Sequence, residues 1–338
     1  MIRSILLGLV IVVCAVAGVA GYLAFDFLTV APERPGHDKA VFIDPGQSFE
    51  SVAAMLVTEG VLRDAQGFRF LAKVTEKGGR IKAGEFVVST GWTPLRLLDY
   101  LTTAKGVQHK LVAPEGLTMR QVARLAEEAG LCSAQAFLKA ASDPELLKKY
   151  AIPAETAEGF LFPDTYLFTR NRADDGTYVV ETMLREFWKR VEAVWPTAKP
   201  EGSQLLHLVT LASIVEKETG VDAERPRVAG VFLNRMAKGM LLQTDPTIIY
   251  GLGDRYTGSL TRANLEDPTN PYNTYTRPGL PPGPICSPGL KSLQAAAAPE
   301  LHDYYYFVAN GQGEHTFSRT LDEHVNAVSK YRRERAKK

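Results

Sequence analysis

The pattern of apolar and polar positions divides the chain into parts of different character. Residues 5–25 contain 21 positions without a charge, close to the roughly 20 that an α-helix needs to cross a bilayer. Residues 205–215 form a second apolar run that leaves almost no polar face, which is typical of a helix enclosed by protein. Elsewhere, short apolar segments alternate with polar turns. We therefore predict an α+β fold that begins with a single transmembrane helix.

The first apolar run is expected to anchor the chain. Arg3 precedes it and Asp26 follows it, so the positive-inside rule leaves the start in the cytoplasm and the rest outside. A cleaved signal peptide is the alternative, but the apolar region of such a peptide is usually only about 7–15 residues long. We expect residues 1–29 to form a cytoplasmic stub and a transmembrane anchor, and residues 30–39 to form a tether. The expected location is an inner (cytoplasmic) membrane, with the body of the protein in the periplasm.

A short unit of strand, polar cap and helix recurs after the tether. Gly46 and Gly116 occupy the same place in two copies that lie 70 residues apart, and a third copy lies between them. Ser48, Thr93 and Thr118 precede the three helices, and Ser and Thr are favoured N-caps. The strands are expected at residues 41–43, 84–88 and 110–113, and the helices at residues 49–56, 95–101 and 119–129.

Small β/α units of this kind pack helices on a short sheet. Residues 40–108 resemble a LysM-like module, a type that binds amino-sugar polymers, and a generic small α+β scaffold fits the same pattern. Residues 109–338 are expected to form one larger domain. Within that domain, residues 142–200 look helical apart from residues 158–166.

That break has the sequence EGFLFPDTY. Aromatic residues packed around a Pro-Asp turn usually make a structural corner. Phe160, Phe162 and Tyr166 would otherwise provide the floor of a sugar site, because sugar rings stack on aromatic faces. Further elements are expected as an amphipathic helix at 224–238, a long ordered proline-rich loop at 268–289, a hairpin with strands at 304–309 and 315–318, and a basic tail.

Composition narrows the function by exclusion. The formal net charge is +1, which gives no broad electrostatic footprint for nucleic acid. The three cysteines form no metal or redox spacing, and Cys132 and Cys286 are expected to be buried thiols. The sequence has no HExxH, no GxSxG and no phosphate-binding glycine loop. We expect neither a metal nor a cofactor.

Two carboxylates end the second apolar run. Glu216 and Glu218 are two residues apart, which places them about 200° apart around a helix. Glu218 shares its side with apolar residues (Leu211, Ile214 and Val215), whereas Glu216 shares its side with Val209, Ala212 and Ser213.

Burial favours the protonated carboxyl and raises its pKa, and the negative end of the helix dipole acts in the same direction. A carboxyl that stays protonated near neutral pH is what a general acid needs. Alternatively, both glutamates pair with Lys217, Arg225 or Arg227 at an ordinary exposed helix end. Asp164 and Asp245 are each a possible second carboxylate, but both stand beside a proline in a setting typical of turns.

Several segments carry a resemblance over nearly the whole chain. They are ASIVEKET from residue 212, VFLNR from 231, LQTDPTIIYG from 242, YNTY from 272 and GLPPGPI from 279, together with EGFLFPDTY. In these segments the chain resembles the MltG (YceG-like) endolytic murein transglycosylases. The resemblance implies a mixed α+β, lysozyme-like catalytic domain at 109–338. It also implies a lyase that cuts the MurNAc–GlcNAc β-1,4 bond of nascent peptidoglycan and leaves a 1,6-anhydro-MurNAc end.

The family's catalytic glutamate falls on Glu218. Most glycosidases need two carboxylates, but a lytic transglycosylase can use one, because the nucleophile is the sugar's own 6-hydroxyl. The candidates for holding the glycan are Gln243, Thr244, Tyr250, Asn273 and Tyr275, each of which could instead fix the loop. The alternatives are a non-catalytic peptidoglycan-binding or scaffold protein, and a hydrolase with Asp245 as base. The implied partners are glycan strands, penicillin-binding synthases and the elongation or division machinery, with the enzyme ending glycan elongation.

Overall fold

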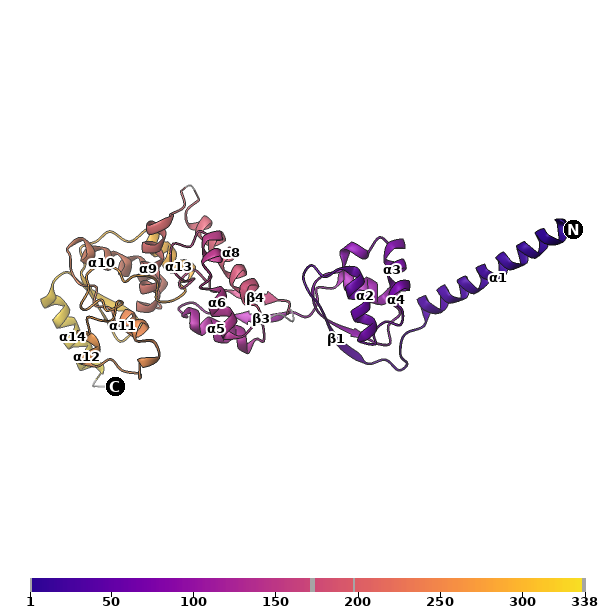
Figure 1. Cartoon of the computed structure of the whole chain (residues 1–338). Coiled ribbons are helices and arrows are strands. Elements are labelled where there is room, and N and C mark those ends of the chain that lie inside the picture. The colour runs from indigo at the N-terminus through magenta and orange to yellow at the C-terminus, as the bar shows by residue number, and fades with distance from the viewer. Residues whose placement is uncertain (1, 171–173, 197, 336–338) are drawn as a thin grey trace. The chain divides into compact units, whose positions relative to one another are not determined.

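The computed structural model describes residues 2–170, 174–196 and 198–335, so the first residue of the predicted stub and the last three of the predicted tail lie outside it. The described part is a mixed α+β structure with three two-stranded sheets (Figure 1). This confirms the predicted α+β class. The chain divides into two compact units, one of residues 1–109 with 167–173 and the other of residues 110–166 with 174–338. The functional domain boundaries given above stay predictions.

The N-terminal helix α1 (Ile2–Thr29) contains a stretch of 22 residues, Gly8–Thr29, that is long and apolar enough to cross a membrane. A signal sequence near an N-terminus can meet the same criteria of length and hydropathy. The single N-terminal apolar helix is therefore observed, while its role as an uncleaved anchor stays a prediction.

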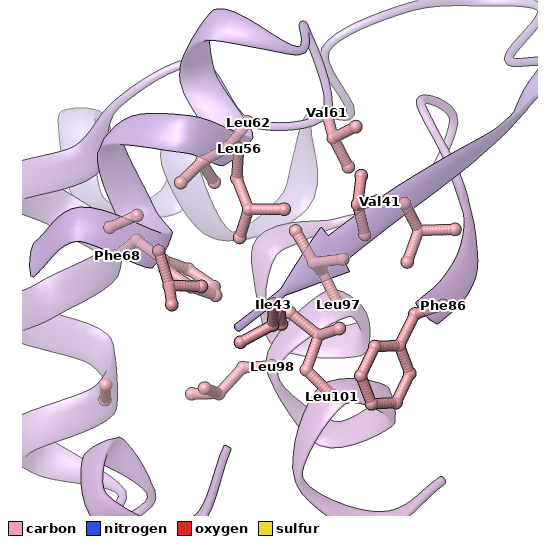
Figure 2. Close-up of a cluster of buried hydrophobic side chains, with 14 of the residues drawn as sticks. Val41, Ile43, Leu56, Val61, Leu62, Phe68, Phe86, Leu97, Leu98 and Leu101 are labelled. Atoms are coloured by element: carbon pink, nitrogen blue, oxygen red, sulfur yellow. The ribbon is translucent and has the colours of Figure 1, made fainter. Parts of the chain in front are cut away.

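The first unit has two antiparallel strands, β1 (Asp38–Ile43) and β2 (Gly84–Ser89), with Val41 opposite Phe86. The predicted helices are α2 (Phe49–Thr58) and α4 (Pro94–Thr103). Ser48 and Thr93 cap them as predicted, each accepting a backbone N–H with its side-chain oxygen. Figure 2 shows the buried side chains that hold this unit together: Val41, Ile43, Leu56, Val61, Leu62, Phe68, Phe86, Leu97, Leu98 and Leu101.

One helix of this unit was not predicted. Helix α3 (Ala65–Val74) begins at Asp64, whose carboxylate accepts the backbone N–H groups of Gln66 and Gly67. It buries Phe68, Leu71 and Ala72 against the other helices. No strand precedes it, so the strand–cap–helix pattern could not reveal it.

The second unit starts with the repeated pattern. Strand β3 (His109–Val112) pairs with β4 (Thr165–Phe168), and helices α5 (Met119–Glu128), α6 (Ala134–Ala140) and α7 (Pro144–Lys149) follow β3. The equivalent glycines adopt the same left-handed backbone, with φ +78° at Gly46 and +77° at Gly116. Thr118 caps α5 in a capping box with Gln121. The backbone therefore confirms the relation between the two copies.

The prediction that residues 142–200 are helical apart from residues 158–166 is wrong for residues 150–157, 167–170 and 174–176. There the chain contains β4, and the next helix is α8 (Thr177–Val194). The physical reason is the aromatic corner: Phe160, Phe162 and Tyr166 are all buried, and the Tyr166 hydroxyl donates to the Phe162 carbonyl at 2.6 Å. The structural interpretation of the corner is confirmed, and the buried rings cannot serve as an exposed sugar platform.

The rest of the second unit surrounds α9 (Gly202–Glu218), whose residues from Val209 to Val215 are all buried. Helices α10, α11 and α13 contact it. The elements are η2 (Asp222–Glu224), α10 (Arg225–Ala237), α11 (Asp245–Leu252), η3 (Gly253–Arg255), α12 (Arg262–Glu266), α13 (Leu290–Ala297), the antiparallel strands β5 (Tyr306–Ala309) and β6 (His315–Ser318), and α14 (Leu321–Arg335), with η1 (Gly78–Arg80) in the first unit.

The predicted hairpin is confirmed, and two other expectations are wrong. Asp245 is not in a turn but is the first residue of α11, and Pro246 follows it in the first turn of the helix. Proline is favoured at this position because its missing N–H has no partner within the helix. The basic tail is helix α14, with Asp322 and Glu323 in its first turn and arginines in its last, an arrangement that suits the helix dipole.

Candidate active site

The two carboxylates at the end of α9 have different surroundings. The Glu216 side chain is only 7% exposed, and its Oε2 lies 3.0 Å from Nη1 of Arg225. The same oxygen accepts the Ser292 hydroxyl at 2.8 Å and the Gly289 backbone N–H at 3.0 Å. A buried ion pair completed by further hydrogen bonds ties α9 to α10 and α13. For Glu216, the predicted pairing with an arginine is confirmed, but the expected exposed setting is wrong, because both side chains of the pair are buried.

Glu218 faces an open cavity of about 440 Å³. The walls of the cavity are formed by the end of α9, by α10, by the segment that leads into α11, and by the C-terminal hairpin and helix. The lining residues are Glu218, Phe232, Arg235, Leu242, Gln243, Thr244, Asp245, Pro246, Tyr275, Tyr306, Phe307, Leu321 and His324. Of the two glutamates, only Glu218 is among them, as the face analysis of the helix had favoured.

Thr244 makes the direct contact with Glu218. Its hydroxyl donates a hydrogen bond to Oε1 of Glu218. Thr244 is also the N-cap residue of α11, yet its side chain makes no capping hydrogen bond. A threonine N-cap ordinarily accepts a backbone N–H, so here the side chain serves the glutamate instead.

A second threonine fixes Thr244 in place. The backbone N–H of Thr244 donates to the Thr274 hydroxyl at 3.1 Å, and that hydroxyl lies 2.9 Å from the hydroxyl of Thr247. All three threonines are buried. Through Thr274, the proline-rich loop is held against the residue that contacts Glu218.

The electrostatics of the cavity favour a protonated Glu218. Burial raises the pKa of its carboxyl, and the negative charge of Asp245 raises that pKa further. The hydrogen bond from Thr244 and the positive charges of His315 and Arg235 oppose the shift, and the pKa stays above its ordinary value. Each effect has the sign expected for desolvation, like charge and hydrogen bonding to the ionised form.

Two more of the predicted binding residues line the cavity. The Tyr275 hydroxyl donates to Oδ1 of Asp245 at 2.6 Å. Gln243 is exposed and has a φ of +50°, a left-handed backbone that is costly for a residue with a Cβ. Its backbone N–H donates to the Thr274 carbonyl at 3.1 Å. Strained backbone of this kind is concentrated at functional sites. Here it occurs at Gln243, the residue directly before Thr244.

The remaining two predicted residues lie outside the cavity lining. Tyr250 donates its hydroxyl to Oε2 of Glu158 at 3.1 Å and packs against Tyr272. Asn273 has no exposed surface, and its amide nitrogen donates to the carbonyls of Asn264, Leu265 and Asp267 at 2.8–3.2 Å. Both side chains stabilise the loop, which is the second role that the sequence left open for them.

Glu158 is a second buried carboxyl. It accepts the backbone N–H of Met119, the first residue of α5, at 3.0 Å. Burial raises its pKa to about 7, although the bonds from Met119 and Tyr250 act in the opposite direction. It does not line the cavity of Glu218. We therefore assign Glu158 a structural role, in which it stabilises the start of α5 and the aromatic corner.

Among the polar and charged residues of the cavity, the sequence missed three: Arg235, Tyr306 and His324. The guanidinium of Arg235 is held by backbone carbonyls, from Nε to Tyr305 at 2.7 Å and from Nη1 to Leu242 at 2.8 Å. The Tyr306 ring contacts this guanidinium at 5.2 Å and stacks on the His324 imidazole with ring centroids 5.2 Å apart. Burial and the charge of Arg235 lower the pKa of His324. Arg235 belongs to the VFLNR segment, which carries part of the family resemblance and could have indicated it. His324 belongs to α14, for which the sequence predicts only a basic tail.

Within the described residues, no group of three or more His, Cys, Asp or Glu side chains could hold a metal ion. Cys132 and Cys286 are buried and unpaired, as expected.

Comparison with known proteins gives the family of this chain. The model of the YceG-like family matches residues 41–330. A protein of Bacillus subtilis (strain 168) named endolytic murein transglycosylase is 32% identical over 86% of this chain and 83% of its own length. A protein of the same name from Streptococcus pneumoniae serotype 2 (strain D39) is 27% identical over 94% of this chain and 64% of its own length.

A crystal structure gives the same relation. It is that of a yceG-like protein, lmo1499, from Listeria monocytogenes, with a TM-score of 0.55 and 32% identity over 86% of this chain and 98% of that one. The chain belongs to the YceG-like family.

Proposed function

We propose that this protein is an endolytic peptidoglycan lytic transglycosylase, a lyase with Glu218 as its single general acid and base. The related proteins of Bacillus and Streptococcus bear the name endolytic murein transglycosylase. The observation that carries the assignment to Glu218 is the contrast at the end of α9. Glu216 is closed off by its ion pair with Arg225, whereas Glu218 faces the cavity with one hydrogen bond from Thr244.

The proposed reaction needs one carboxyl in two states. Protonated Glu218 gives its proton to the glycosidic oxygen as the bond from C1 of MurNAc to O4 of GlcNAc breaks. The resulting carboxylate then takes the proton of the MurNAc 6-hydroxyl, whose oxygen forms a bond to C1. The products are a free GlcNAc 4-hydroxyl and a 1,6-anhydro-MurNAc end, with no water consumed. The raised pKa of Glu218 supports its first role, because it keeps the proton available near neutral pH.

The cavity residues support separate roles in this scheme. Gln243 and Tyr275 are proposed to hold the glycan with amide and phenol groups. Thr244 is proposed as a positioning residue, because its hydroxyl is already donated to Glu218. For Tyr250 and Asn273, the hydrogen bonds described above support a loop-fixing role in place of sugar contact.

The N-terminal part supports a location for this activity. We propose that α1 crosses an inner membrane with the remaining chain in the periplasm, where nascent glycan strands are made. Residues 40–108 are proposed as a LysM-like module and residues 109–338 as the catalytic domain. Association with penicillin-binding synthases and the elongation or division machinery, and a role in ending glycan elongation, stay part of this proposal.

Mass spectrometry of the product ends tests the proposal. Purified protein incubated with unnicked glycan strands should release fragments that end in 1,6-anhydro-MurNAc. A reducing MurNAc end would contradict it and indicate a hydrolase. Absence of any cleavage would indicate the non-catalytic glycan-binding alternative.

One observation favours the hydrolase as a second candidate. Asp245 lines the same cavity as Glu218, and a hydrolase needs a second carboxylate. Its carboxylate accepts the Tyr275 hydroxyl. The mass of the product ends separates this candidate from the lyase, because hydrolysis adds one water molecule to each cut.

A further inference from the structure

Helix α3 carries an exposed apolar stripe. Phe70 is 71% exposed and Val74 is 64% exposed, although both are apolar and stand one helical turn apart. Arg69 and Lys73, each adjacent to one of them in sequence, are also exposed. We call these four residues the α3 stripe. The opposite side of the helix buries Phe68, Leu71 and Ala72, so the fold of the unit does not require the exposed pair.

The same side of α3 is joined to the end of α1. Nη2 of Arg63 lies 3.0 Å from the Asp26 carboxylate and donates to the carbonyls of Asp26 and Val30 at 3.1 and 3.2 Å. A Cβ at Gly67 would come within 3.0 Å of the Phe27 ring, so glycine leaves room for that ring. Arg63 precedes the N-cap of α3, and within the helix Gly67, Phe70 and Val74 follow one another at spacings of three and four residues. One side of α3 therefore continues from the end of α1 into the stripe.

We propose that the α3 stripe lies on the surface of the membrane that α1 crosses. A stretch that carries both aromatic or aliphatic side chains and arginine or lysine suits the boundary between headgroups and acyl chains. Phe70 and Val74 enter that boundary, and Arg69 and Lys73 contact the phosphates of anionic phospholipids. The proposal rests on α1 as a membrane helix and does not depend on the catalytic role of Glu218.

A glycan is the competing occupant. Phe70, Arg69 and Lys73 also line a shallow cavity of about 670 Å³ together with Phe49 and Gln66. Val74, however, is nearly as exposed as Phe70 and does not line that cavity. A bound sugar would leave Val74 in water, whereas a lipid surface covers both apolar side chains. The contacts of Arg63 and Gly67 with the end of α1 also favour the lipid surface, because they join α3 to the helix that is proposed to cross the membrane.

Fluorescence quenching in a bilayer tests the proposal. The full-length chain is placed in nanodiscs of phosphatidylethanolamine and phosphatidylglycerol, with and without bromine on the acyl chains. The test variant is Phe70→Trp. The matched control is Val87→Trp, because Val87 is 41% exposed and lies on the face of β2 that points away from the core. The signal of the three native tryptophans is subtracted with the parent protein.

The added emission of Phe70→Trp should lose most of its intensity in brominated nanodiscs, while that of Val87→Trp should change little. Equal quenching of the two variants would overturn the proposal. It would also be overturned if chitooligosaccharides shifted the emission of Phe70→Trp while brominated lipid did not, since that result assigns the stripe to glycan. Quenching does not depend on turnover, so either failure leaves the proposed function untouched.

Discussion

The two sides of the end of α9 present the same side chain in opposite settings. On one side, Glu216 is enclosed by Arg225, Ser292 and the backbone of Gly289. On the other side, Glu218 has the Thr244 hydroxyl as its hydrogen-bond donor and a cavity in front of it. A buried carboxylate with a complete set of partners stabilises the structure, while one with few partners and free space keeps its proton for chemistry. The predictions below test this contrast, in order of decreasing effect.

Replacing Glu218 by glutamine should abolish most of the activity. Removal of a general acid and base costs about 10²–10⁴-fold in rate, so the formation of anhydro ends should fall by at least that factor. The rate of product formation, followed by mass spectrometry, provides the measurement.

The same variant should not lose stability, because the burial that raises the pKa of Glu218 penalises its ionised form. Stability of the parent protein should therefore fall as pH rises from the ordinary pKa of a glutamate through the raised pKa of the folded state. Glutamine carries no such charge, so Glu218→Gln should lack the part of this fall that Glu218 causes and keep the part that Glu158 causes. Urea unfolding at several pH values checks the sign, and a less stable glutamine variant at neutral pH would contradict it.

Replacing Glu216 by glutamine should instead destabilise the fold. It leaves the buried Arg225 guanidinium with Asp222, a 63% exposed carboxylate at 3.1 Å, in place of a buried charge partner. Breaking a buried pair in this way costs about 3–5 kcal/mol. Urea unfolding gives the free energy directly. The matched control is Glu300→Gln, whose pair with Arg227 is 37% and 39% exposed and should be worth about 0–1 kcal/mol. Similar losses in the two variants would contradict the contrast.

Thr244 should tune the acid without being part of it. Thr244→Val removes a hydrogen bond that lowers the pKa of Glu218, so that pKa should rise and the alkaline limb of the rate should move to higher pH. We expect a loss of about 10- to 100-fold in kcat, since a hydrogen bond to a charged group is worth roughly 1.5–3 kcal/mol. Thr244→Ser keeps the hydroxyl and should keep the profile. An unchanged profile in the valine variant would sink the positioning role.

Asp245 should act in the opposite direction and more weakly. Its charge raises the pKa of Glu218, so Asp245→Asn should move the alkaline limb to lower pH with little loss of peak rate. Asp254→Asn is the control, because Asp254 is exposed and does not line the cavity. Complete inactivation by Asp245→Asn would instead favour the hydrolase, in which Asp245 is the base.

Local patterns made much of the fold predictable. The N-terminal helix, the recurring capped helices, α9, α10 and the C-terminal hairpin each follow from spacing and caps within one segment. The preference for Glu218 over Glu216 also came from local geometry, because the neighbours of a helical residue are fixed by the helix itself.

Contacts between distant segments were not predictable in the same way. The sequence around Asn273 does not indicate that its amide donates to three backbone carbonyls. The sequence around Tyr250 does not indicate that its hydroxyl donates to Glu158. The sequence pattern treated α14 as a tail, because its mostly polar composition hides the fact that Leu321 and His324 line the cavity. Such placements depend on how the whole unit packs, and a pattern read along one segment does not contain them.

The most direct test compares the two glutamates in one assay. Glu216→Gln and Glu218→Gln are measured at equal concentrations of folded protein, at a temperature low enough for both to be native. The measured quantity is the number of 1,6-anhydro-MurNAc ends released from unnicked strands per unit time. We predict that Glu216→Gln keeps most of the rate per folded molecule and that Glu218→Gln loses it. The reverse order, or equal rates, would contradict the assignment of Glu218.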